Sequence, residues 1–272
     1  MTIPSGLIGV VHLPPIPGDP RHRGSQSFDD ALSFALTDAQ SLVDGGVDAI
    51  IIENFGSAPF PKGTAGDRIH PHQVAFLARV ATKCRARFDI PIGVNCLRND
   101  APAAVGIAAA TNLDFIRVNI HTGAYVTDQG LIEGEAHRTL RYRRQLGVDD
   151  IAILADVFVK HAAPLVAIET EEAVQDTVQR GCADAIIVTG QATGHPVDTA
   201  FVQQVVRAAN DTPIFIGSGL NAENASELAA LSCGAIVGTY FKKGGQIHNP
   251  VDQRRVRQIT DLAQGQFRQT TA

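Results

Sequence analysis

The sequence has no tryptophan, a single methionine and four cysteines, and it contains no long uninterrupted run of apolar residues. Cys84, Cys96, Cys182 and Cys233 are widely separated and form no C-x-x-C pair, so their spacing indicates neither a disulfide framework nor a zinc site. We expect buried, reduced thiols. No segment reaches the roughly 20 apolar residues of a membrane-spanning helix, and the N-terminus lacks the basic start of a signal peptide. These absences favour a cytoplasmic protein with no integral membrane segment.

A strongly basic surface is also absent. The formal net charge of the 272 residues is −5, and Lys and Arg are scattered apart from the RYRR run at residues 141–144, which we interpret as a solvated helix face. This distribution gives no footprint for a nucleic acid. With 44% hydrophobic and 19% charged residues and no linker or low-complexity segment, the chain is expected to form one domain, residues 1–272, around a large core.

Short runs rich in β-branched residues recur along the whole chain. We interpret eight of them as strands: Leu7–Leu13, Ala49–Phe55, Pro91–Leu97, Phe115–His121, Ile151–Val159, Ala185–Gly190, Pro213–Gly219 and Ala235–Phe241. Stretches with helical spacing separate them. Strands that alternate with helices predict parallel pairing, because a helical crossover carries the chain back to the start of each strand.

Eight strand–helix units in this length predict an α/β fold, a single (β/α)₈ TIM barrel. An open doubly wound sheet is the alternative. Glycines stand just before several strands, at Gly46, Gly147, Gly181 and Gly234, where a left-handed backbone would end a helix.

The fourth strand run, FIRVNIHTGA, alternates between apolar and polar residues. In a closed barrel one side of each strand faces the helices and the other faces the lumen. We therefore expect Ile116, Val118 and Ile120 to face the helices and Arg117, Asn119 and His121 to point inward. An unpaired charge in a lumen is costly, so we interpret Arg117 as pairing with Glu53 or Asp156 to neutralise the interior.

Polar residues near the ends of the other strands are the candidates for chemistry, because strand-end residues in this fold surround the active-site mouth. The candidate catalytic residues are His12, Glu53, Asn119, His121, Asp156 and Lys160. The candidate substrate- and phosphate-binding residues are Asn95, Thr189, Gly190, Gly217, Ser218, Gly219, Gly238 and Thr239. A structural role in the lumen is the alternative for each ionisable member of the set.

The last two strand ends indicate an anion site. PIFIGSGLNAENASEL predicts a strand, a Gly-Ser-Gly turn and a helix that begins near Asn221, with free backbone N–H groups at its N-terminus. GTYFKKGG follows the last strand and supplies Lys242, Lys243 and two glycines. Loops after the seventh and eighth strands of such barrels often bind phosphate. Simple turn chemistry and a surface hairpin are the alternatives.

Three mouth loops are too long for plain connectors and are interpreted as lids. They follow the first, second and fourth strands, and the last of them is TGAYVTDQGLIEGEAHR. Phe55, Phe60 and Tyr125 are expected either to close over an organic ring or sugar or to fix the loops to the barrel rim.

The motifs VVHLPPIPGDP, GGVDAIIIENFGSAPF, PIGVNCLRND, FIRVNIHTGAYVTDQGLIEG, ILADVFVKHA, IIVTGQATG, IGSGLNAEN and GTYFKKGG occur in this order over nearly the whole chain. In this the chain resembles the BtpA family, which includes SgcQ-like members. The resemblance implies a TIM barrel. It also implies a link to photosystem I biogenesis at thylakoid membranes, through the factor that gave the family its name.

Two functions follow. The first is an enzyme, of the lyase, isomerase or hydrolase class, that acts by general acid/base chemistry on a phosphorylated sugar, nucleoside or related metabolite, with Lys160 either binding an anion or forming a Schiff base. The second is a noncatalytic photosystem I biogenesis factor, peripherally membrane-associated. We predict no cofactor, since no G-x-G-x-x-G follows the first strand; a divalent metal is a minor alternative. A homo-oligomer is also expected.

Overall fold

The computed structural model describes residues 3–189 and 198–268. In this part of the chain eight parallel strands close a barrel in the order β1-β11-β10-β9-β7-β4-β3-β2, so the predicted TIM barrel is confirmed. The barrel strands are β1 (Gly6–His12), β2 (Ala49–Glu53), β3 (Ile92–Asn95), β4 (Phe115–Val118), β7 (Ala152–Val157), β9 (Ala185–Val188), β10 (Ile214–Ile216) and β11 (Gly234–Val237).

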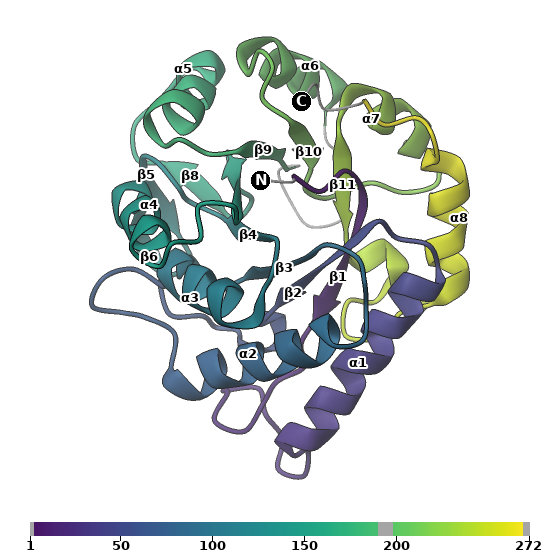
Figure 1. The fold of residues 1–272 in the computed structure, drawn as a ribbon. Helices are drawn as coiled ribbons and strands as arrows, with labels where there is room; N and C mark the ends of the chain where they lie inside the picture. The colour runs from purple at the N-terminus through teal and green to yellow at the C-terminus, as the bar shows by residue number, and fades with distance from the viewer. Residues whose placement is uncertain (1–2, 190–197, 269–272) are drawn as a thin grey trace.

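Helices surround the barrel (Figure 1). They are α1 (Phe28–Asp44), α2 (Pro71–Arg85), α3 (Ala101–Thr111), α4 (Ala136–Gln145), α5 (Thr170–Gln175), α6 (Thr199–Ala208), α7 (Ala225–Leu231) and α8 (Gln253–Ala263), with a π-helical turn at Asp176–Arg180 and 3₁₀ turns at Phe55–Ser57, Thr239–Phe241 and Lys243–Gly245. Local sequence fixes several helix starts: Ser27 and Asp30 form a capping box at α1, and prolines occupy the first turns of α2 and α3. None of the described helices is long and apolar enough to cross a membrane.

At three places an aspartate just before a strand accepts a backbone N–H from the first or second residue of the preceding barrel strand. Asp48 accepts from Leu7 N at 2.7 Å, Asp114 from Ile92 N at 2.7 Å and Asp184 from Ile153 N at 2.8 Å. Each bond fixes the register of two neighbouring strands and satisfies a backbone donor that the ladder leaves open.

The glycines expected to end helices behave differently from one another. Gly46 and Gly147 have positive φ angles of 93° and 69°, as predicted. Gly181 has a φ of −79°, and Cys182 takes the left-handed position instead, with a φ of 49°. Gly234 begins β11.

The interior of the barrel is apolar at its lower levels. Ile8, Ile51, Phe115, Leu154 and Phe215 belong to one buried cluster inside the strands, and Ile50, Ile116 and Val118 belong to the larger cluster between strands and helices. The predicted directions of Ile116 and Val118 are therefore confirmed. Large aromatic rings at the bottom leave room for polar side chains only near the carboxyl ends of the strands.

A second, three-stranded sheet lies beside the barrel on the side of α4 and α5 (Figure 1). It consists of β5 (Ala124–Thr127), β6 (Gly130–Glu133) and β8 (Ala162–Pro164), all antiparallel. The loop after β4, interpreted from the sequence as a lid, is thus a hairpin paired with the segment after β7. Tyr125 is 9% exposed and packs with Ile120, Ile132 and Val159 under this sheet, so it fixes the loop to the rim.

Candidate active site

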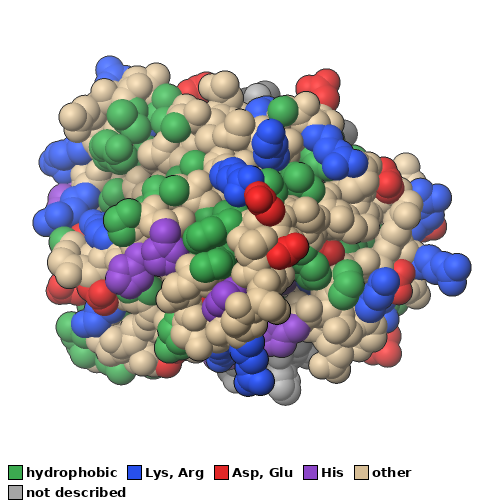
Figure 2. All heavy atoms as spheres, turned by 90° about the horizontal axis from the view of Figure 1, so that it is seen from below, with side chains coloured by type: hydrophobic (Ala, Val, Ile, Leu, Met, Phe, Trp, Pro, Cys, Tyr) green, Lys and Arg blue, Asp and Glu red, His purple; other side chains and the backbone are tan. Residues whose placement is uncertain are grey.

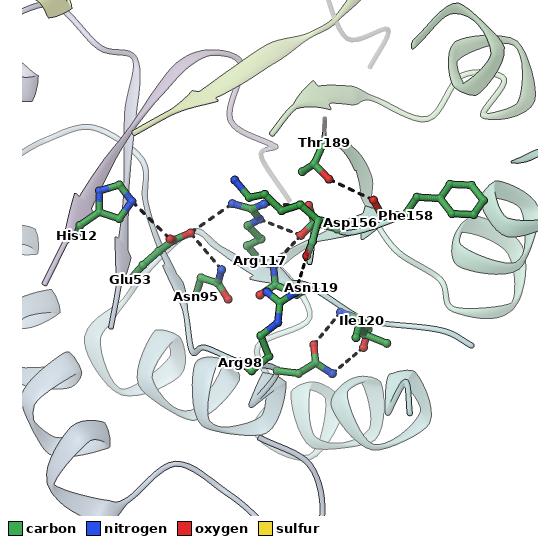
Figure 3. A network of polar contacts seen from close by, with 12 residues as sticks. His12, Glu53, Asn95, Arg98, Arg117, Asn119, Ile120, Asp156, Phe158 and Thr189 are labelled. Atoms are coloured by element: carbon green, nitrogen blue, oxygen red, sulfur yellow. Dashed lines mark hydrogen bonds and ion pairs between the residues drawn. The ribbon is translucent and has the colours of Figure 1, made fainter. Parts of the chain in front are cut away.

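Arg117 lies at the centre of a buried polar network near the carboxyl ends of β2, β4 and β7 (Figure 3). Its guanidinium donates to both Asp156 oxygens at 2.9 Å and to Glu53 Oε1 at 3.3 Å. Asn119 donates to Asp156 Oδ2 at 3.0 Å, and Asn95 donates to Glu53 Oε1 at 3.1 Å. The pairing predicted for Arg117 is confirmed. Burial opposes its charge, but Asp156 and Glu53 outweigh burial and raise the pKa of Arg117.

His12 and Glu53 form the next layer of this network. His12 Nε2 lies 3.9 Å from Glu53 Oε2, and the imidazole packs edge-on against Phe55 with the ring centroids 4.9 Å apart. Burial lowers the pKa of His12 well below 6.5, and the positive charges of Lys242, Lys160 and Arg117 lower it further. His12 is therefore a neutral imidazole at pH 7, beside a carboxylate oxygen to which the protein donates no hydrogen bond among the described contacts.

A cavity of about 590 Å³ opens above this network. It brings together the following predicted site residues: His12, Glu53, Asn95, Asn119, Lys160, Gly217, Ser218, Gly219, Gly238 and Thr239. Phe55 and Phe60 line it as well. Ten residues at or just beyond seven separate strand ends thus line one cavity, as expected for the mouth of this fold.

Three arginines in the cavity wall, Arg21, Arg98 and Arg255, were not found from the sequence. Arg98, three residues beyond β3, is 7% exposed and donates through Nη2 to the Lys160 carbonyl at 2.7 Å. Burial lowers its pKa, and Asp156 partly offsets that effect. Arg255 comes from α8, where its guanidinium stacks 4.2 Å from the Tyr240 ring centroid. Arg21 and Arg255 do not lie at a strand end, which was the feature used to select candidates. Arg98 directly follows the predicted Pro91–Leu97 run, as Lys160 follows Ile151–Val159, so its position could have identified it.

The loops after β10 and β11 form the wall of the cavity that begins beside His12. Ser218 Oγ is buried and has no hydrogen-bond partner among the described residues, and the Gly217, Gly219 and Gly245 backbone lies beside it in the wall. A methyl group on Gly238 would lie 2.5 Å from His12 Cε1, so only glycine lets this loop approach the imidazole without displacing it. This region has the composition of an anion site: bare backbone, a free hydroxyl and the Arg255 guanidinium.

Two expectations for these loops are wrong. The helix predicted to begin near Asn221 begins at Ala225, because Asn side chains take up the intervening donors: Asn221 Oδ1 accepts from Glu223 N at 2.8 Å and Asn224 Oδ1 accepts from Asn221 N at 2.8 Å. Lys242 does not face the cavity. It is 0% exposed and donates to Asp38 Oδ2 on α1 at 2.5 Å.

His121 does not point into the lumen, contrary to the expectation for the fourth strand. The strand ends at Val118, and the Asn99 side chain then binds both the N–H and the C=O of Ile120 at 2.8 Å, which ends the alternation of sides. Ile120 packs under the small sheet instead of against the helices. The His121 ring, 1% exposed, is hydrogen-bonded through Nε2 to the Gly181 carbonyl at 2.8 Å, outside the cavity wall.

Asp156 and Thr189 lie below the cavity surface. The Asp156 carboxylate is 0% exposed and fully engaged with Arg117 and Asn119, so it lacks the access to a ligand that a catalytic group needs. The Thr189 hydroxyl donates to the Phe158 carbonyl at 3.3 Å. Gly190 lies outside the described residues. Within residues 3–189 and 198–268, no three His, Cys, Asp or Glu side chains gather closely enough to hold a metal ion.

The outer surface differs from the cavity. Lys and Arg side chains are interspersed with Asp and Glu over the face drawn in Figure 2. Arg143 of the RYRR run is half-buried and pairs with Asp184 at 2.7 Å, so this part of the run is structural and not a solvated face.

Sequence comparison links the chain to known proteins over almost its full length. The sequence model of the BtpA family matches residues 4–265. Photosystem I biogenesis protein BtpA of Synechocystis sp. is 45% identical over 250 residues, which cover 92% of this chain and 85% of the relative. Putative sgc region protein SgcQ of Escherichia coli is 31% identical over 255 residues, which cover 94% of this chain and 92% of the relative.

Solved structures with the same architecture share little sequence. N-(5'-phosphoribosyl)anthranilate isomerase from Pyrococcus furiosus superposes with a TM-score of 0.56 at 13% identity and covers 95% of this chain and 98% of its own. Thiamine phosphate pyrophosphorylase from the same organism gives a TM-score of 0.56 at 12% identity and covers 95% of each chain. At this level of identity the similarity shows the fold.

Proposed function

The chain belongs to the BtpA family, and from this premise we propose that it is an enzyme acting by general acid/base chemistry on a phosphorylated sugar, nucleoside or related small metabolite. The observation that carries the proposal is the single cavity of about 590 Å³, which contains the His12–Glu53 pair and the Ser218 and Gly238 loops together. A ligand that fills it would meet acid/base groups at one part and an anion site at another.

The electrostatics of the cavity support a reacting group next to Glu53. Arg117 and Asn95 both donate to Oε1, which leaves Oε2 for a substrate proton. The neutral His12 imidazole lies beside that oxygen and can donate to, or accept from, a substrate hydroxyl or carbonyl. Proton transfer between these two groups fits the lyase, isomerase and hydrolase classes.

The charge of the wall supports a phosphorylated ligand. Arg98, Lys160 and Arg255 face the cavity, and among its described lining residues only Glu53 and Glu223 carry negative charge. Buried positive charge without a partner is unfavourable, so a bound anion would stabilise this wall. The names of the two structural neighbours, each of which includes a phosphate-bearing compound, are consistent with this.

The test combines binding and turnover. Inorganic phosphate and a panel of sugar phosphates and nucleotides are screened by thermal shift, where a ligand at a hundred times its Kd stabilises by about 2.7 kcal/mol. Arg255→Met should weaken binding about tenfold or more, while Arg254→Met, an exposed neighbour on α8, should not. For a ligand that is turned over, Glu53→Gln should keep the binding and lose roughly 10²- to 10⁴-fold in kcat. No shift with any phosphorylated compound would reject the proposal.

A second candidate, a noncatalytic photosystem I biogenesis or stabilisation factor with peripheral membrane association, is favoured by the name of the 45% identical relative. The enzyme requires the acid/base groups of the cavity, and the noncatalytic factor does not. If Glu53→Gln and His12→Gln fold normally and each fully restores the phenotype of cells that lack the natural protein, the noncatalytic function is favoured over the enzyme.

A further inference from the structure

Lys160 is a half-buried lysine, and the two carboxylates nearest to it are hydrogen-bonded to Arg117. It lies three residues beyond the end of β7 and lines the cavity with Glu53. Arg117 occupies both Asp156 oxygens and shares Glu53 Oε1 with Asn95. Among the described residues no carboxylate oxygen lies within 4.0 Å of the Lys160 ammonium, although Glu53 and Asp156 are both close enough to act on its charge.

Lys242 shows what a structural lysine looks like in the same protein. It is completely buried, and its ammonium lies 2.5 Å from Asp38 Oδ2. Asp38 in turn accepts the Val251 N–H at 2.8 Å, so the pair is embedded in the packing between α1 and the segment before α8. Within residues 3–189 and 198–268, Lys160 has no such counterion, and it faces the cavity. A lysine used only to fill or neutralise this region would be expected to pair with a carboxylate, as Lys242 does.

The surroundings of Lys160 favour the free amine. Burial is the main cause that lowers its pKa, to about 8, and Arg117 lowers it further, while Glu53 and Asp156 act in the opposite direction. Arg98 also lowers it, and His161, the next residue, and His12 are the titratable imidazoles on which the Lys160 charge acts in turn. A pKa of about 8 leaves on the order of a tenth of the molecules with a neutral amine at pH 7, several hundred times the fraction for an ordinary lysine.

We propose that Lys160 is the nucleophile of this site and forms a Schiff base with a phosphorylated aldehyde or ketone. The inference rests on the proposed function, which supplies the phosphorylated ligand, and narrows its substrate class to carbonyl compounds. Two observations support it: Lys160 lines the cavity, and the nearby Asp156 and Glu53 carboxylates are hydrogen-bonded to Arg117 and not to Lys160.

The step balances with groups already in the cavity. Lys160 first gives one ammonium proton to the free Oε2 of Glu53, and the neutral amine then attacks the carbonyl carbon. The amine nitrogen loses a second proton and the former carbonyl oxygen gains one, which gives a carbinolamine. The hydroxyl then takes back the proton held on Glu53 and leaves as water, so that a protonated imine remains. No oxidant, reductant or further reactant is consumed, and one water is released for each imine formed.

The test is reductive trapping of the full chain. The protein is incubated with glyceraldehyde 3-phosphate or dihydroxyacetone phosphate and sodium borohydride, and the adduct is located by intact mass and peptide mapping. We expect one adduct per chain, on Lys160, formed at least tenfold faster than with unphosphorylated glyceraldehyde. Lys160→Arg, which keeps the charge but has no primary amine, should lose it, and Lys83→Arg, which alters an exposed lysine on α2, should retain it.

The trapping rate should rise roughly tenfold between pH 7 and pH 9, because the neutral fraction of an amine with a pKa of about 8 rises from about 0.09 to about 0.9. Adducts spread over exposed lysines, or an adduct on Lys160 that forms equally fast without the phosphate, would overturn the inference. Phosphate-dependent thermal stabilisation without any adduct on Lys160 would overturn it and leave the proposed function standing. Absence of both the thermal stabilisation and the Lys160 adduct would overturn this inference and the proposed function together. Mapping of the wild-type chain decides these outcomes even if Lys160→Arg fails to fold.

Discussion

Replacing Arg117 by methionine tests the view that this arginine exists to hold two carboxylates inside the barrel. The substitution keeps much of the aliphatic volume and removes the guanidinium. Asp156 would then keep one donor, Asn119, and Glu53 would keep Asn95. Both carboxylates would remain buried, at 0% and 7% side-chain exposure, without a positive partner in hydrogen-bond contact.

Breaking a buried pair by removing one member costs about 3–5 kcal/mol. For a chain of this length each kcal/mol corresponds to about 2–4 °C in Tm, so Arg117→Met should melt roughly 6–20 °C lower, and the free energy of unfolding from urea titration should fall by the same 3–5 kcal/mol. Asp29→Asn, which breaks a pair with Arg79 whose side chains are 79% and 44% exposed, serves as the control. It should cost less than about 1 kcal/mol.

The stability of Arg117→Met should depend on pH through its two unpaired carboxylates. An orphaned buried carboxylate has a pKa above its unfolded value, so the native variant binds protons that the unfolded chain does not. Its stability should therefore recover as pH falls through that raised pKa. Adding Asp156→Leu to Arg117→Met should restore stability, since one orphaned charge is gone. A loss below about 1 kcal/mol, or a double variant less stable than Arg117→Met, would refute the reasoning.

Three further outcomes follow from the same contacts. Lys242→Met should lower the free energy of unfolding by about 3–5 kcal/mol in urea titration, because it leaves Asp38 buried without a cation; a change under about 1 kcal/mol would contradict this. Gly134→Ala should cost roughly 1–3 kcal/mol by the same measurement, since the added carbon would lie 2.5 Å from the His121 carbonyl oxygen. Because the pKa of His12 lies below 6.5 in the native state, its contribution to stability is present above pH 6.5 and lost as pH falls through the native pKa, so His12→Leu should lose less stability than wild type between pH 7 and pH 5. Equal losses would count against a buried neutral imidazole.

The barrel was predictable because its strands carry a strong and repeated signal. Each of the eight apolar runs overlaps an observed strand, and the side facing the lumen follows from alternation as long as the strand lasts. Arg117 and Asn119 point inward for this reason. The predicted strands extended too far at their carboxyl ends. A sequence shows where an apolar run stops, but it does not show where a side chain such as Asn99 hydrogen-bonds to the backbone and ends the strand, as happens before His121.

What the sequence did not reveal depends on contacts between distant segments. The β5–β6 hairpin has strands of four residues each and gains stability by pairing with β8, some 35 residues later in the chain. Arg255 reaches the cavity from the last helix, and no local pattern distinguishes it from the exposed Arg254 beside it. Residues at strand ends can thus be predicted from their position, whereas those supplied by helices and loops become visible only with the tertiary structure.

The aromatic rings of Phe115 and Phe215 plug the barrel beneath Arg117. A compound that enters the mouth therefore finds no second exit at the bottom of the barrel and must leave through the mouth. For the enzyme proposed above, product and incoming substrate would use the same opening, so substitutions at the lining residues Phe55 and Phe60 are expected to change entry and release more than the chemistry at Glu53.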